Sequence, residues 1–212
     1  MRLFRGMASA ALFVTAAFSI VLYTACKKEK YPPVPDKCAG IVCKNNGVCI
    51  QGECDCTAGY SGEFCDKKNI APYIGNWSVT QEVVSVNGKP VSGRASTYTM
   101  TISEDASGVT ILNFSNFMGE PGFDNVLGRI GMTIAIVKNH DDLFVETEVI
   151  AHPSNFLFKR YQALGQSGKQ LLKGEGSINS LGTQMSGEFY VVYADTAGPA
   201  EERVKFSAEY IN

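Results

Sequence analysis

Cysteine is the residue type with the clearest chemical potential in this chain, because six of its seven cysteines are clustered. The clustered residues are Cys38, Cys43, Cys49, Cys54, Cys56 and Cys65. The segment 38–65 that contains them is too short to bury a hydrophobic core of its own, so it needs disulfides or a metal. It contains no histidine and no Cys-x2-Cys pair of the kind usual at zinc sites. The spacing therefore favours disulfides, and the cysteine count alone leaves their pairing open.

The other side chains that could do chemistry follow no catalytic motif. His140 lies in a polar turn and His152 in a loop, and neither is next to a nucleophile motif, a zinc-binding His-Glu-x-x-His or a phosphate loop. Glu175 and Glu188 are isolated in the sequence, and we expect them to face solvent. We therefore expect a protein that is not an enzyme, with no cofactor and no bound metal.

The composition is that of an ordinary globular protein, with 45% hydrophobic and 19% charged residues. The formal net charge is −2. Because no basic surplus is available to neutralise phosphates, nucleic acid is not expected as a partner.

The N-terminus has the pattern of an export signal. Arg2 and Arg5 precede an uncharged run over 6–25, and Cys26 follows small residues at its end. An uncleaved anchor helix is the alternative, because such a run rises about 30 Å and could span a bilayer. Setting Cys26 aside leaves an even number of cysteines for pairing, which favours a cleaved signal over 1–25.

Thr24-Ala25-Cys26 resembles the signal of bacterial lipoproteins, although Tyr23 stands where an aliphatic residue is usual. The resemblance implies that Cys26 is acylated and binds the lipid bilayer. Residues 26–37 are rich in lysine and proline and predict an extended tether. Lys28-Glu29 resembles the surface-export signal of Bacteroidetes lipoproteins, which implies the outer membrane or cell surface of a Gram-negative bacterium.

The cysteine spacing over 38–65 resembles an EGF-like module, as does the run from Cys54-Asp55-Cys56 through Gly59-Tyr60 and Gly62 to Cys65. The resemblance implies the pairs Cys38–Cys49, Cys43–Cys54 and Cys56–Cys65. Calcium is not expected, because only Asp36, beside Lys37, precedes the first cysteine. The module would serve as a spacer or as a protein-contact surface.

Residues 71–212 contain no cysteine and must fold on a hydrophobic core. Apolar residues recur there with a period of two, which indicates strands. We predict strands near 75–86, 96–104, 108–117, 128–138, 143–150, 155–162, 170–179, 184–194 and 202–211. The second half of 128–138 should keep Ile134 and Ile136 on the face of Ile130. Short turns between so many strands predict a mostly β fold, either an up-and-down barrel or a β-sandwich.

The opening Ile74-Gly75-Asn76-Trp77 resembles the Gly-x-Trp of lipocalins, so the barrel is expected to be lipocalin-like. The resemblance implies that Gly75 and Trp77 lie at the closed end of the barrel. Four further residues could line a pocket or complete the core: Phe123, Phe144, Phe156 and Phe158. We expect a membrane-anchored binding protein whose barrel carries a small apolar ligand. The alternative is surface adhesion or scaffolding, in which the EGF-like module and the barrel exterior contact a surface protein.

Overall fold

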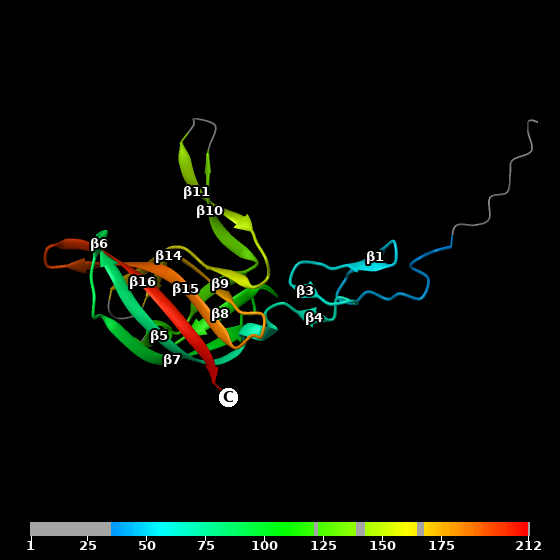
Figure 1. The fold of residues 1–212 in the computed structure, drawn as a ribbon, viewed down its shortest axis with the longest axis horizontal. Coiled ribbons are helices and arrows are strands. Elements are labelled where there is room, and N and C mark those ends of the chain that lie inside the picture. Colours follow the sequence, from blue (N-terminus) through cyan, green and yellow to red (C-terminus); the bar gives the residue numbers. More distant parts are fainter. Residues whose placement is uncertain (1–34, 121–122, 139–142, 165–167, 212) are drawn as a thin grey trace, which may run out of the picture. The chain divides into compact units, whose positions relative to one another are not determined.

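The computed structural model describes residues 35–120, 123–138, 143–164 and 168–211 (Figure 1). The chain divides into two units after Ala39. In the described residues no helix is both long and apolar enough to cross a membrane.

The cysteine-rich segment is held by disulfides and very short strands. Its strands are β1 (Val48–Ile50) with β2 (Glu53–Asp55), and β3 (Tyr60–Ser61) with β4 (Lys67–Lys68). Cys43 is bonded to Cys54, and Cys56 to Cys65. Cys38 and Cys49 are disulfide-bonded as well, so the segment has three disulfides. Cys65 is fully buried while most of the surrounding residues are exposed. The disulfides therefore stabilise a segment that has little hydrophobic core of its own.

The main domain is a closed, eight-stranded antiparallel barrel, which confirms the prediction of a barrel rather than a sandwich. Its strands are β5 (Gly75–Val86), β7 (Ala95–Glu104), β8 (Ile111–Ser115), β9 (Val126–Ile130), β12 (Asn155–Phe158), β14 (Lys169–Ile178), β15 (Gln184–Asp195) and β16 (Gly198–Ile211). Each pairs with the next along the chain, and β16 pairs back with β5, which closes the ring. The order is therefore up-and-down.

Four small elements are attached to this ring. Strand β6 (Lys89–Pro90) pairs with β5, and β13 (Gln162–Leu164) pairs with β14. Two short 3-10 helices, η1 (Ala71–Tyr73) and η2 (Phe117–Gly119), precede β5 and follow β8.

The alternation of residue types explains which face of each strand is buried. In β16 the side chains of Val204, Phe206 and Ala208 are buried, and Lys205 and Ser207 between them are exposed. This agrees with the period-two pattern of the sequence. Because the sheet closes on itself, every inward position meets side chains from the opposite wall of the barrel.

Phenylalanine dominates the barrel interior. Phe123, Phe156 and Phe158 are at most 1% exposed. Of the two roles expected from the sequence, lining a pocket or completing the core, these three have the second. Phe156 packs on Gly176 so closely that a Cβ there would lie 2.5 Å from its ring. A larger residue at that position of β14 would displace the ring.

One predicted strand, 128–138, is wrong as a single element. It breaks at Gly131, whose φ is +74°, into β9 and β10 (Met132–Lys138). Among the described strands, β10 pairs only with β11 (Phe144–Ile150), and in Figure 1 this hairpin lies outside the ring. Glycine adopts such a φ without steric cost, which allows the chain to leave the barrel wall.

The broken strand also overturns two expected burial sites. Ile136 does not share a core face with Ile130, because it is 72% exposed. Phe144 neither lines a pocket nor completes the core, and it is 73% exposed. Both lie on the hairpin, where no opposite barrel wall covers them.

Candidate functional site

The two residues predicted at the closed end of the barrel lie together at the start of β5. Trp77 is fully buried, and its Nε1–H donates to the backbone oxygen of Tyr73 at 2.8 Å. Gly75 has a φ of +137°, and a Cβ there would lie 2.6 Å from the ring of Tyr210. Tyr210 also packs edge-on against Trp77, with ring centroids 5.3 Å apart. Glycine at position 75 therefore leaves space for the tyrosine that covers the tryptophan.

The centre of the barrel, where an apolar ligand was expected, is filled by side chains. Six phenylalanines form a continuous cluster with ring centroids between 4.9 and 6.4 Å apart: Phe114, Phe117, Phe156, Phe158, Phe189 and Phe206. Such pairs stabilise the core by about 0.5–1.5 kcal/mol each beyond the area that they bury. The described interior is thus a packed core.

A polar chain lies where β15 and β16 meet. Glu202 is only 2% exposed, accepts a hydrogen bond from the Tyr193 hydroxyl at 3.0 Å, and forms an ion pair with Arg94 at 2.8 Å. Lys169 lies over the Tyr193 ring at 5.9 Å and pairs with Glu120 at 2.6 Å. Because each buried charge has a partner, these polar contacts can stabilise the fold without a bound ligand.

Hairpin β10–β11 carries three of the four most exposed large apolar side chains among the barrel's described residues, and Leu181 is the fourth. Ile150 is 90% exposed, Phe144 73% and Ile136 72%. The strand register places these three on one face of the hairpin, since Met132 is opposite Ile150 and Ile136 is opposite Glu146. Glu146 and Glu148 lie between Phe144 and Ile150 on this face. Exposed apolar groups of this size are candidates for contact with a partner.

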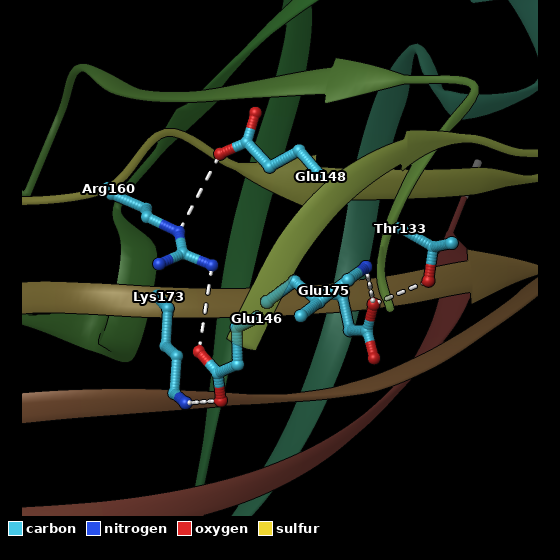
Figure 2. A network of polar contacts seen from close by, with 7 residues as sticks. Thr133, Glu146, Glu148, Arg160, Lys173 and Glu175 are labelled. Carbon is cyan, nitrogen blue, oxygen red and sulfur yellow. Dashed lines mark hydrogen bonds and ion pairs between the residues drawn. The ribbon is translucent and has the colours of Figure 1, made fainter. Parts of the chain in front are cut away.

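The hairpin is held to the barrel by an anchor network made of Thr133, Glu146, Glu148, Arg160, Lys173 and Glu175 (Figure 2). One carboxylate oxygen of Glu175 accepts hydrogen bonds from the Thr133 hydroxyl at 2.7 Å and from the Ile134 backbone N–H at 2.9 Å. Glu175 is therefore half-buried and bonded, which corrects the expectation that it faces solvent. Glu188 was also expected to be isolated, but it pairs with Arg203 at 2.6 Å.

The second half of the anchor network is ionic. Lys173 on β14 donates a hydrogen bond to Glu146 on β11, and this contact lowers the pKa of the Glu146 carboxyl below its ordinary value. Arg160 lies between two glutamates, with Nη2 3.7 Å from Glu146 and Nε 3.6 Å from Glu148 (Figure 2). These distances give Coulomb attraction but exceed a hydrogen bond.

Sequence reasoning missed most of this network. Arg160, Lys173 and Glu146 belong to three separate segments, and nothing local to any of them signals the contact. His152 was noted in the sequence and bonds only locally among the described contacts, with Nδ1 2.9 Å from the Ser154 hydroxyl. Cys26 and His140 lie outside the described residues.

No known protein-family model matches the chain. A search of curated proteins found no match either.

Proposed function

We propose that this protein is an exported, lipid-anchored binding protein without catalytic activity, and that hairpin β10–β11 is its contact surface. The observation that carries the proposal is the exposure of Ile136, Phe144 and Ile150 on one face of a hairpin fixed at its base. Leaving large apolar groups in water costs free energy, which a partner that covers them would recover.

Strand β11 also has a free edge. It pairs with β10 and with no other described strand, so one side of its backbone has no described sheet partner. Such an edge can accept another strand through main-chain hydrogen bonds. Five of its seven residues, Phe144, Val145, Thr147, Val149 and Ile150, are of types that favour strands.

The partner that best fits this edge is a second copy of the same chain. Strand β11 reads Phe-Val-Glu-Thr-Glu-Val-Ile, so that its residue classes repeat in reverse around Thr147. An antiparallel pair of β11 strands centred on Thr147 would place Phe144 opposite Ile150 and Val145 opposite Val149. A two-fold interface requires this kind of self-complementarity.

The same pairing would place Glu146 opposite Glu148 of the second copy. Like charges directly opposite each other destabilise a sheet. Here Lys173 and Arg160 of each copy already lie against these glutamates, and their positive charges offset the repulsion. The proposed function is therefore surface adhesion or scaffolding by self-association.

A cysteine at the proposed two-fold axis tests this pairing. In protein carrying Cys26→Ser, Thr147→Cys should form an intermolecular disulfide, because residues facing each other in an antiparallel pair have Cα atoms about 4.5–5.5 Å apart, which a disulfide can span. The matched control is Thr80→Cys, on the exposed face of β5, which has a strand on each side. Equal cross-linking of the two variants would contradict the pairing.

Light scattering provides a second test. The unmodified protein should form dimers as its concentration rises, and Phe144→Lys should shift the equilibrium toward the monomer. Leu181→Lys is the control, since Leu181 is 80% exposed but lies in the turn between β14 and β15. A protein that stays monomeric at all concentrations would overturn self-association.

The N-terminal part of the proposal depends on the sequence alone. Acylation of Cys26 would attach the chain to a bilayer, and a proline-rich tether with an EGF-like module would separate the barrel from the membrane. The three disulfides support an oxidising, extracytoplasmic environment. Mass spectrometry of the exported protein tests the anchor: a mature chain that begins at an acylated Cys26 is expected, and an unmodified Met1 would contradict it.

Carriage of an apolar ligand inside the barrel stays a prediction from the sequence. The packed phenylalanine cluster does not support it, because a ligand would have to displace several buried rings. Native mass spectrometry of the exported protein would test it, since a retained ligand adds mass.

A further inference from the structure

A cavity of about 310 Å³ lies on the outer face of β8, β9 and β12, beside the hairpin. Its apolar lining includes Ile111, Leu127 and Leu157. Leu157 is only 4% exposed although it alternates with the inward-facing Phe156 and Phe158. The cavity thus combines apolar and charged side chains on the outer side of the barrel wall.

The strand register explains why these side chains meet. Ile111 on β8 is paired with Arg129 on β9, and Arg129 with Leu157 on β12, so the three form one row across neighbouring strands. Leu127 lies two residues along β9 on the same face. Because neighbouring strands are about 4.8 Å apart, Ile111 and Leu157 lie about 10 Å apart on the outer face, with Arg129 between them.

The rim of the cavity is cationic. Arg129, Lys159 and Arg160 line it together with a single carboxylate, that of Glu148, which gives a local excess of two positive charges. Arg129 and Lys159 are exposed and form no ion pair with any described residue. They are therefore available to an anion.

Arg160 adds positive charge to this rim without a close hydrogen bond. Its Nε and Nη2 are buried, and they lie 3.6 Å from Glu148 and 3.7 Å from Glu146. Because this edge of the guanidinium group already faces two carboxylates, Arg129 and Lys159 are the groups available to bind an anion.

We propose that this cavity binds a small aromatic monocarboxylate. The carboxylate would accept hydrogen bonds from Arg129 and Lys159, and the ring would lie against Ile111, Leu127 and Leu157. Guanidinium groups stack on aromatic rings, which favours a ring over a flexible chain. The volume is at the lower end of the range for small-molecule sites, so the ligand has to be small.

This inference goes beyond the proposed self-association and does not depend on it. The cavity is formed by barrel strands and the base of the hairpin, whereas the proposed pairing uses the free edge of β11. A protein that stays monomeric could still bind the carboxylate, and a dimer could fail to do so.

An NMR titration of the full chain carrying Cys26→Ser, with 4-phenylbutyrate as the probe, tests the proposal. Saturable shifts are expected at the backbone amides of β8, β9 and β12. The double variant Arg129→Gln/Lys159→Gln should weaken binding about tenfold or more, because hydrogen bonds to charged groups are lost. Lys205→Gln is the matched control, since Lys205 is an exposed lysine on the outer face of β16, away from the cavity.

Two related compounds separate the contribution of the carboxylate to binding from that of the aromatic ring. The neutral alcohol 4-phenylbutan-1-ol should bind at least about tenfold more weakly, because it lacks the charge that the rim requires. Butyrate should also bind more weakly, because it lacks the ring. The proposal is overturned if the alcohol binds as tightly as the carboxylate, if the double variant binds like Lys205→Gln, or if the protein binds no 4-phenylbutyrate.

Discussion

The barrel core and hairpin β10–β11 are made of similar residues in similar strands, but their surroundings differ. Phe156 on β12 is fully buried, whereas Phe144 on β11 is 73% exposed. Every strand of the ring has a neighbour on both sides, while β10 and β11 have only each other among the described strands. Closure of the sheet, more than the residue types, therefore decides which apolar side chains become core.

The two regions also differ in what holds them in place. The ring is stabilised by packed phenylalanines, and the hairpin by the anchor network at its base. Contacts between partly exposed charges stabilise far less than buried apolar surface does. The hairpin should therefore detach under conditions that leave the barrel folded.

The largest expected effect comes from removing one ring from the core. Phe156→Ala should reduce the free energy of unfolding by about 3–5 kcal/mol, because it leaves a cavity in a closely packed cluster. Phe144→Ala should change it by less than about 0.5 kcal/mol, because the side chain is mostly in water. Denaturant unfolding of disulfide-intact protein measures both, and equal losses would remove the distinction between the two regions.

The sequence predicts the strands of the barrel better than it predicts the hairpin that leaves it. Period-two alternation located β5, β15 and β16 to within a few residues, because each has one face in the core and one in solvent. The same alternation continues through Gly131, so it could not show that the chain leaves the barrel there. A hairpin outside the ring has the same period as a strand within it.

The anchor network and the cavity were beyond prediction for a related reason. Arg160, Glu146 and Lys173 meet only because β11 of the hairpin lies against β14 and the segment that follows β12. Charged residues in strands usually face solvent, which is why Glu175 was expected to do so. Pairs between distant segments leave no local pattern.

An intermediate loss of stability is expected from substitution of Gly131, the glycine between the barrel wall and the hairpin. Gly131→Val should destabilise the protein by about 1–2 kcal/mol, because a β-branched residue is strained at positive φ. The added side chain would not clash at its base, since the nearest atom to a Cβ there is the Ala151 backbone oxygen at 3.8 Å. Gly131→Asn should lose less, because asparagine adopts this conformation more readily. Thermal unfolding compares the two, and equal losses would contradict strain as the cause.

The smallest effect is the pH dependence of the hairpin's attachment. Because Lys173 lowers the pKa of Glu146 from its ordinary value of 4.5, the pair stabilises the folded state above that pH, and this contribution is lost as pH falls through the lowered pKa. Hydrogen exchange in β11, corrected for the intrinsic rate, should therefore increase on acidification while exchange in β15 stays slow.

Lys173→Met is the control for this titration. It should weaken the attachment by about 0.2–1 kcal/mol at neutral pH and remove the acid-dependent increase. An increase that persists in the variant would mean that another group is responsible.

The barrel closes only when β16, the last strand in the sequence, pairs with β5, the first strand of the ring. The backbone N–H of Glu201 donates to the Asn87 side chain at 2.8 Å across a sequence separation of 114 residues. Contacts of such high contact order form slowly. Until β16 has formed, β5 and β15 each have an unpaired edge, so aggregation or binding by a chaperone would compete with closure of the barrel during that interval.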